Sequence, residues 1–551
     1  MNAEYTRKRN AVACRVCRSR RTKCDGKRPK CSFCHNAGAT CTYAASSNST
    51  SVNTTLEKNI SSILSKLGRI EEAVVKDEVE SLDDVLQRAQ PPPVDFPWMT
   101  LKTVSFITLT TGLAYNLSDE VIRLETLNQV PQQLSTKFML IPRHGQVELI
   151  HFFFANTHKW FPLLDEWTYL THCELVLQSP LSNSADSALL LMVLALGAHV
   201  SHTTLAVEQG TEYFYRAQSI LASVIADPGL IAVQCLILCS VYLGYMCRPL
   251  QSYQYLSTAS MKLRTLMLCA RSRVNSDLEE AERRAYWTLL ILESEYCVQL
   301  DLVDTGIINA DEQVRLPSFD DAQIENAYTP LGHDCTTEPD QFAYFLAEIT
   351  MRRSLDRCRD PLTLGHKRKD TENRFAPIVA RELETQLQKW HEHLPSSIAF
   401  DLEDLDTSVQ NVFSLFLRAQ YYVCFCTIFW PSLVQAIRKE TSTNLEDVST
   451  YKRFFESYIH FMSSISALLK HQTPLEWTLR ASVFSVSVAA LKARQSGKFD
   501  HVLPYGLDDT LRDALPLIRR NEEPDLSLRF CSDILGKLID QWQMSVNVMI
   551  T

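Results

Sequence analysis

Six cysteines near the start of the chain have the spacing of a metal site. They form two copies of the pattern C-x2-C-x6-C, at Cys14, Cys17 and Cys24 and again at Cys31, Cys34 and Cys41. In each copy the C-x2-C pair directs two thiolates at one ion from the start of a short helix, and the third cysteine returns after that helix. Zn2+ takes four soft ligands in a tetrahedron. Six thiolates give two ions four ligands each only if two thiolates are shared, so the pattern predicts a binuclear zinc cluster.

Basic side chains fill the segment that follows the second cysteine. Arg18, Arg20, Arg21 and Lys23 lie within six residues. Residues 1–43, which we call the head, hold 11 Lys or Arg against two acids, so their formal charge is +9. Because the whole chain carries −9, the remainder carries −18. A segment with so high a positive charge attracts the phosphates of nucleic acids. We therefore expect nucleic-acid binding to be confined to the head.

The cysteines and their neighbours also resemble a known domain. Residues 13–43, ACRVCRSRRTKCDGKRPKCSFCHNAGATCTY, resemble the binuclear zinc cluster domain of fungal transcription factors. The resemblance covers the six cysteines, the basic first helix, the Asp25-Gly26 turn and the proline two residues before the fourth cysteine. It implies two Zn2+ ions bridged by Cys14 and Cys31, and a cis peptide bond before Pro29. One ion then takes Cys14, Cys17, Cys24 and Cys31, and the other takes Cys14, Cys31, Cys34 and Cys41.

The same resemblance implies how the head reads double-stranded DNA. In the family, the short helix after the second cysteine enters the major groove, and two adjacent basic residues reach a CGG-like triplet. By position these are Arg20 and Arg21, and an arginine fork reaches O6 and N7 of guanine together. Arg18 and Lys23 are expected to contact phosphates. For Arg20 and Arg21 the alternative is a phosphate contact or a part in a nuclear-import signal, to which residues 7–9 would also belong.

A disulfide scaffold or a different zinc module fits the cysteines less well. Disulfide scaffolds belong to secreted proteins, whereas residues 1–10 are polar and basic, unlike a secretory signal. Other zinc modules use different spacings and some histidine. The 11 cysteines outside the head stand singly in apolar surroundings, as at Cys269 and Cys424. This usage indicates reduced thiols packed as small hydrophobes inside a cell.

A linker and a heptad pattern follow the head. Residues 44–55 are rich in Ser, Thr and Asn and predict a flexible linker. Apolar residues then recur with spacings of 4, 3, 4, 3 and 4, at Leu56, Ile60, Ile63, Leu67, Ile70 and Val74. This seam predicts a short coiled coil over 56–76 that makes the chain a homodimer. The alternative is an amphipathic helix packed on its own chain. Residues 77–134, with PPPVDFP at 91–97, are expected to be a linker and boundary region.

From about residue 135 to 551 the chain predicts a large multi-helix regulatory domain, so the expected fold class is all-α. Glycine is scarce, at 15 residues, and no regular strand alternation recurs. Helices are expected at, among others, 185–200, 211–225 and 229–246. Residues 146–330 resemble the fungal-specific transcription factor domain, or middle homology region. The motifs that carry this resemblance are Phe152-Phe153, Lys159 to Leu164 (KWFPLL), Glu282 to Trp287 (ERRAYW) and Val314 to Pro317 (VRLP).

One apolar run is long enough to span a membrane. Residues 229–247 are 19 residues with only Gln234 and Ser240 strongly polar. No basic anchor or comparable span follows, so we interpret the run as a buried helix of the regulatory domain and expect no membrane partner. Residues 400–406 and 505–518 combine acidic and apolar side chains and are candidate coactivator surfaces; the simpler interpretation is a solvated helix face.

These patterns together predict a zinc-dependent, sequence-specific DNA-binding transcription factor. It would act in the nucleus on RNA polymerase II transcription. It would bind paired CGG-like triplets as a homodimer and control metabolic or biosynthetic genes, including those of secondary metabolism. Its further partners would be the transcription machinery or coactivators, with a small-molecule effector left open. No G-x-S-x-G, H-E-x-x-H or Walker sequence occurs, so we expect no enzyme. The alternative is a zinc-stabilised protein or RNA interaction module without sequence-specific duplex binding.

Overall fold

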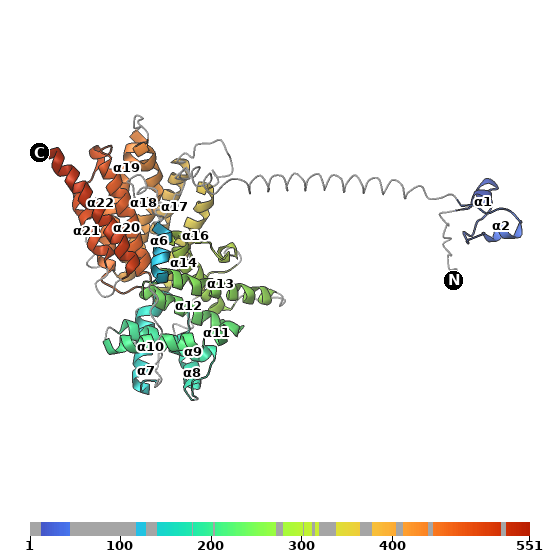
Figure 1. The fold of residues 1–551 in the computed structure, drawn as a ribbon, viewed down its shortest axis with the longest axis horizontal. Helices are drawn as coiled ribbons and strands as arrows, with labels where there is room; N and C mark the ends of the chain where they lie inside the picture. Colours follow the sequence, from blue (N-terminus) through green and yellow to red (C-terminus); the bar gives the residue numbers. More distant parts are fainter. Residues whose placement is uncertain are drawn as a thin grey trace. The chain divides into compact units, whose positions relative to one another are not determined.

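The computed structural model falls into two compact units, residues 1–90 and 91–551, and we call the second unit the body (Figure 1). The residues that it describes are 13–43, 117–127, 140–178, 180–201, 204–271, 279–300, 302–310, 314–318, 338–363, 377–403, 411–438, 445–519 and 525–550. Every regular element within these ranges is a helix, which confirms the predicted all-α class. The predicted linker 44–55 and coiled coil 56–76, with all six of its seam residues, lie outside the described residues.

The first half of the body is built around two helices that are apolar on all sides. Its elements are α6 (Leu117–Leu127), α7 (Arg143–Phe152), the π-helix η1 (Phe153–His158), α8 (Glu166–Leu177), α9 (Ala185–Val200), α10 (Thr204–Ser219), α11 (Leu221–Ala226), α12 (Leu230–Tyr245), α13 (Pro249–Arg271) and α14 (Glu280–Leu300). α9 packs against α7, α10 and α12, and α12 packs against α13. Because α9 and α12 lack a polar face, they are stable only inside a core, and nearly every residue of both is buried.

The second half is a group of longer helices. Its elements are the 3-10 turn η2 (Ile307–Ala310), α16 (Glu338–Thr363), α17 (Pro377–Glu392), α18 (Val412–Arg438), α19 (Leu445–Leu468), α20 (Glu476–Gln495), the 3-10 turn η5 (Asp500–Val502), α21 (Leu507–Ile518) and α22 (Leu526–Ile550). α18 and α19 pack along each other, and α20 contacts α18, α19, α21 and α22 (orange and red in Figure 1). α20 also contacts α12 and α14, so it joins the two halves.

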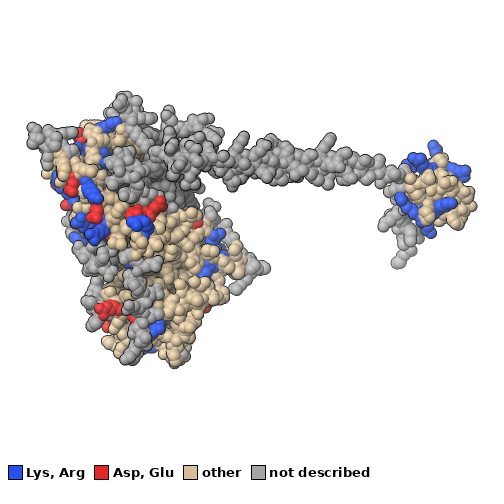
Figure 2. All heavy atoms as spheres, in the orientation of Figure 1, with Lys and Arg blue, Asp and Glu red and all other residues tan. Residues whose placement is uncertain are grey.

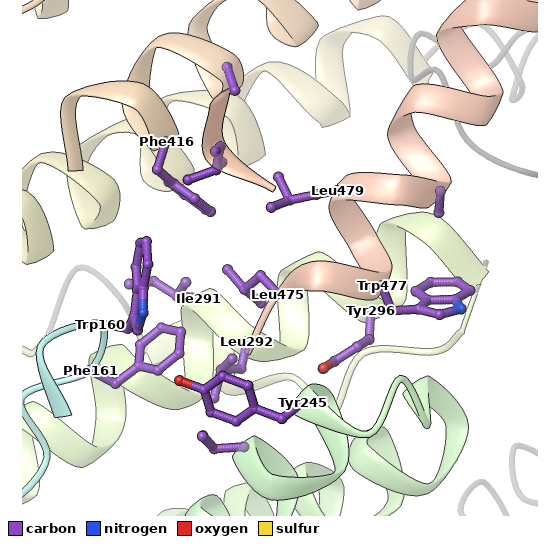
Figure 3. Close-up of a cluster of buried hydrophobic side chains, with 14 of the residues drawn as sticks. Trp160, Phe161, Tyr245, Ile291, Leu292, Tyr296, Phe416, Leu475, Trp477 and Leu479 are labelled. Carbon is purple, nitrogen blue, oxygen red and sulfur yellow. The ribbon is translucent and has the colours of Figure 1, made fainter. Parts of the chain in front are cut away.

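The halves meet in an aromatic core (Figure 3). Trp160 is fully buried, and its ring meets those of Tyr344 and Phe413 edge-on, with centroids 5.6 and 5.7 Å away. The preceding His158 holds the turn, because its Nε2 lies 2.9 Å from the Leu164 carbonyl oxygen and 3.1 Å from the Leu164 amide nitrogen. Burial lowers the pKa of His158 to about 3, so the ring is neutral. The KWFPLL motif is therefore the segment that carries Trp160 into the core.

Two motifs of the sequence form one contact in the body. The Trp287 indole nitrogen donates to the Arg315 carbonyl oxygen at 2.9 Å, and the Tyr286 hydroxyl donates to the Ile307 carbonyl oxygen at 2.8 Å. Val314 is buried beside them. The ERRAYW segment of α14 and the VRLP loop thus hold each other in place, although 28 residues separate the two partners of the first bond.

The first helix that the structure describes in the body is tied down by a buried acid. Glu125 of α6 is 5% exposed, and its two carboxylate oxygens accept the amides of Leu250 and Gln251 at 2.8 and 2.9 Å. These amides belong to the first turn of α13, where unpaired N–H groups favour a negative charge. α6 also packs against α14 and α22. The carboxylate of Glu125 therefore fixes α6 to the rest of the body.

The apolar run 229–247 forms α12, and its burial confirms the interpretation as a core helix. Among the described residues, one helix is long and apolar enough to cross a membrane by length and composition, the part of α18 from Val412 to Val434. Of its apolar window, 89% is buried inside the body, as expected for a core helix of a large helical domain. The sequence pattern had not marked this segment as a candidate span.

Two expectations need correction or refinement. The predicted helix 211–225 is wrong as one element, because α10 ends at Ser219 and α11 begins at Leu221. The Ser219 hydroxyl donates to the Arg216 carbonyl and competes with the helical ladder there.

The candidate coactivator segment 505–518 forms α21, whose apolar residues Leu511 and Ile518 are fully buried against neighbouring helices. Its acidic residues are therefore the solvated face of a core helix.

Candidate zinc cluster and DNA interface

The two cysteine half-motifs fold in the same way, 17 residues apart. Each has a short helix, α1 (Arg15–Ser19) in the first and α2 (Ser32–Asn36) in the second. The first cysteine of each half is the N-cap, and its sulfur accepts the amide of the second cysteine at 3.4 Å, from Cys17 to Cys14 and from Cys34 to Cys31. A sulfur at a helix N-terminus therefore satisfies a backbone donor and also remains available to a metal.

The ends of the two helices also correspond. In each half the backbone turns through a left-handed residue, Arg21 with φ 52° and Gly38 with φ 59°. The next amide then bonds back to the second cysteine, from Thr22 to the Cys17 carbonyl and from Ala39 to the Cys34 carbonyl, both at 3.0 Å. This turn brings the third cysteine to the cluster. The sulfurs of Cys24 and Cys41 accept the amides of Cys14 and Cys31 at 3.5 and 3.4 Å.

The six sulfur atoms form two groups of four that fit two metal ions. The groups are Cys14, Cys17, Cys24 and Cys31, and Cys14, Cys31, Cys34 and Cys41, each with all sulfurs within 4.8 Å of one another. The Cys14–Cys31, Cys14–Cys34 and Cys17–Cys31 sulfur distances are 3.8, 3.5 and 3.6 Å. A zinc–sulfur bond of about 2.3 Å gives a tetrahedron with edges of about 3.8 Å. The donor set therefore fits Zn2+ in both groups, and Cys14 and Cys31 belong to both.

The thiols of the cluster differ strongly in acidity before a metal binds. The amide of Cys17 lowers the pKa of the Cys14 thiol to about 6. Burial raises the pKa of Cys34 to about 12, and burial also raises the pKa of Cys17. Zinc requires thiolates, so its binding displaces protons from the buried thiols. The affinity of the cluster for zinc should therefore fall as the pH is lowered.

The charge of the head lies on one of its two halves. Arg18, Arg20, Arg21 and Lys23 are all exposed at and after the end of α1. The corresponding stretch of the second half, residues 32–40, holds no lysine or arginine. Basic side chains stand out on the otherwise uncharged face of the head that is visible in Figure 2. A cluster with an approximate two-fold repeat thus presents phosphate-binding charge from its first half.

Several contacts of the head were not anticipated from the sequence. The carboxylate of Asp25 accepts the Ser32 amide at 3.0 Å and also the Ser32 hydroxyl, which lowers the pKa of Asp25. It joins the loop of the first half to the start of α2. Tyr43 packs on the cluster and bonds to the same loop. The bond before Pro29 is cis, as the resemblance implied. An aromatic residue two positions after the last cysteine was the available signal for Tyr43.

Both parts of the chain match known families. Residues 12–50 match the family described as Fungal Zn(2)-Cys(6) binuclear cluster domain, and residues 150–392 match the family described as Fungal specific transcription factor domain. The first match covers the six cysteines, which implies two zinc ions. Both resemblances inferred from the sequence are thereby confirmed.

Proteins similar to this chain are named as transcription factors. A putative transcription factor of Aspergillus rugulosus, ecdB, is 28% identical over 573 residues, which cover 95% of this chain and 96% of the relative. The transcription factor FBD3 of Gibberella moniliformis is 38% identical over 74 residues, 12% of this chain and 10% of that protein. An ABC-transporter-regulating transcription factor of Aspergillus fumigatus is 48% identical over 42 residues, 8% and 5% of the two chains. No solved structure matches this chain.

These findings place the chain among regulators of transcription that bind DNA, and not among enzymes. The cysteine geometry, the basic first half and the helical body agree with both matched families. The chain therefore carries a fungal Zn(2)-Cys(6) binuclear cluster domain together with a fungal specific transcription factor domain.

Proposed function

We propose that this chain is a nuclear, homodimeric regulator of RNA polymerase II transcription that binds paired CGG-like triplets. The observation that carries the proposal is the one-sided charge of the cluster. Two halves share one backbone arrangement, yet four exposed cations lie at and after the end of the helix of the first half, and residues 32–40 of the second half hold none. Attraction to phosphate alone would not require the positive charge to lie on one half, whereas reading of bases by one helix would.

In this proposal Cys14 and Cys31 bridge the two ions, and the other four cysteines each hold one. When bound, zinc cross-links the two halves and keeps all six sulfurs as thiolates. The amides of Cys17 and Cys34 donate to the sulfurs of the N-cap residues Cys14 and Cys31, which would each hold both ions. The chain's own hydrogen bonds thus orient the sulfurs that both ions share.

Arg20 and Arg21 are proposed to read the triplet, and Arg18 and Lys23 to hold phosphates. Arg20 is the C-cap of α1, and Arg21 is the next residue, so both leave the helix at one end. A bidentate arginine contact to guanine is worth about 1–3 kcal/mol of discrimination. Phosphate contacts add affinity without reading the sequence, and they weaken as salt rises.

Pairing of heads supplies the remaining affinity. The predicted coiled coil 56–76 would hold two heads on linkers 44–55, so that binding of one head raises the effective concentration of the other. The region 77–134, whose helix α6 already packs on the body, would connect this dimer to the regulatory domain 135–551. That domain is proposed to meet the transcription machinery or coactivators and to control metabolic or biosynthetic genes.

Selection of binding sites from random duplex DNA by the full-length, zinc-loaded chain tests the proposal. We expect enrichment of two spaced CGG-like triplets, lost on chelation and restored by zinc. Arg20→Ala and Arg21→Ala should relax the triplet. The matched control is Lys27→Ala, which removes an exposed cation from the same head outside α1; it should weaken all sequences alike.

The outcomes separate the parts of the proposal. Enrichment of single triplets would keep the head as a DNA reader and refute the pairing. No enrichment by the zinc-loaded chain would refute duplex reading and favour a protein or RNA interaction module. If a duplex is selected but an RNA competitor displaces it at equal concentration, this would also favour an RNA interaction module.

A further inference from the structure

The chain leaves the head along a path that is pinned at three places. The Arg15 amide donates to the Thr42 carbonyl oxygen at 2.8 Å. The Tyr43 hydroxyl donates to the Lys27 carbonyl oxygen at 2.9 Å, and the Arg28 guanidinium lies over the Tyr43 ring, 5.0 Å from its centroid. We call residues 42–43 with these contacts the exit anchor. It ties the last described residues of the head to α1 and to the loop between the halves.

The exit anchor has a defined place relative to α1. Arg15 is the first residue of α1, whereas Arg20 and Arg21 follow its last residue. At about 1.5 Å of rise per residue, about 6 Å separates Arg15 from Ser19, the last residue of the helix. The chain therefore departs from the opposite end of α1 to the proposed triplet readers. The direction in which the chain leaves the head is therefore set by contacts with α1 and with the loop between the halves.

A fixed departure limits the sites that two joined heads can occupy. Each head must lie on its own triplet while both linkers converge on one dimerisation segment. The linker 44–55 is predicted to be flexible, so a pinned start biases the separations of the triplets toward those that its direction reaches, whereas an unpinned start adds no such bias. We propose that Tyr43 is a specificity-determining residue that sets the spacing of paired triplets through the exit anchor. This inference rests on the paired binding proposed above.

Tyr43 is the residue of the anchor that a substitution can remove cleanly. Its ring carries the Arg28 contact and its hydroxyl carries the Lys27 bond, whereas the third contact joins backbone atoms. The hydroxyl also lies 3.8 Å from the Cys24 sulfur. A useful test must therefore separate a released exit from a weakened zinc cluster.

The test compares full-length, zinc-loaded chains on a duplex library in which the spacer between two triplets varies in length. We expect wild type to prefer a narrow range of spacers. Tyr43→Ala should lower the ratio of preferred to neighbouring spacers by up to about tenfold, the factor that one hydrogen bond and one exposed cation–π contact supply together. Tyr43→Phe, which keeps the ring, should lie between. Zinc content and affinity for a single triplet should stay within about twofold of wild type.

Phe33→Ala is the matched control, because Phe33 also packs on the cysteine cluster but lies on α2 and takes no part in the exit anchor. It should leave the spacing preference unchanged. Hydrogen exchange gives a second measurement that does not depend on pairing. The Arg15 amide should lose protection in Tyr43→Ala and keep it in Phe33→Ala.

Each outcome is decisive. Unchanged spacing in Tyr43→Ala, unchanged Arg15 protection, or equal broadening in Phe33→Ala would overturn the role of Tyr43 and leave paired binding intact. A wild-type chain that selects single triplets would overturn the paired binding, and this inference with it. Broadened spacing in Tyr43→Ala with retained zinc and retained single-triplet affinity would support the exit anchor.

Discussion

The left-handed backbone at Arg21 predicts a substitution that stabilises the cluster and weakens DNA binding. The equivalent position of the second half is Gly38, the residue type that adopts this conformation without a steric cost. A left-handed residue with a side chain costs about 1–2 kcal/mol. Against this, glycine has more conformational freedom in the unfolded chain, which lowers the free energy of unfolding by about 0.4–1 kcal/mol. The net gain of Arg21→Gly is therefore about 0.5 kcal/mol.

The same substitution removes one of the proposed base contacts. Loss of a bidentate arginine contact costs about 1–3 kcal/mol, or about fivefold or more in affinity for the selected triplet. Arg21→Ala separates the two effects, because it removes the same side chain and keeps a residue that disfavours φ 52°. Both variants should lose the same affinity, and only the glycine variant should gain stability.

A chelator titration of the full-length chain measures the stability of the cluster, and a duplex titration measures the affinity. We expect Arg21→Gly to need about twofold more chelator than Arg21→Ala for half release of zinc, which corresponds to about 0.5 kcal/mol. If Arg21→Gly releases zinc more readily than Arg21→Ala, the left-handed backbone at residue 21 does not destabilise the cluster as reasoned above. If Arg21→Gly binds the selected duplex as tightly as wild type, Arg21 does not read the triplet.

Three further predictions concern the body and the metal. Trp160→Ala should lower the unfolding free energy of the body by about 3–5 kcal/mol in urea, whereas Trp167→Ala, at a side chain 65% exposed, should change it by less than about 0.5 kcal/mol. Chelation should abolish duplex binding and leave the urea midpoint of the body unchanged, because the sulfur clusters lie in the other unit; a shifted midpoint would contradict this independence. Burial raises the pKa of Glu348 to about 8 against the opposing effect of the Arg352 guanidinium, which donates to it at 2.8 Å. The folded body thus keeps a proton that the unfolded chain releases, and its stability should therefore fall as pH rises from about 4.5 to about 8, by at most about 1.4 kcal/mol per pH unit. Glu348→Gln, compared with wild type in urea at about pH 5 and about pH 8, should flatten this dependence; an equal slope in both chains would assign it to other groups.

The parts of the structure that the sequence predicts well are those that local pattern determines. The cysteine spacing is a nearly complete description of the cluster, because each half closes within 11 residues. Helices such as α9 and α12 are recognisable because they are apolar on all sides, which only a core accommodates. The break between α10 and α11 was missed because neither glycine nor proline marks it.

Contacts between distant residues were out of reach. Nothing in the pattern of α6 indicates that Glu125 accepts amides 125 residues away, since an acid on a short helix is ordinarily a surface residue. The left-handed turn at Arg21 is an intermediate case. Alignment of the two halves places it opposite Gly38, and this signal was available in the sequence.

The attachment of α6 through Glu125 sets a limit on how far along a chromosome the body can act. The tether runs from Tyr43, where the head is pinned, to Leu117, where α6 begins. A chain of about 74 residues spans at most about 250 Å at about 3.4 Å per residue. Since duplex DNA rises about 3.4 Å per base pair, this is the length of about 70 base pairs. In the proposed function, a protein bound by the body would therefore lie within about that interval of the occupied triplet, and a weakened α6 attachment would lengthen the interval.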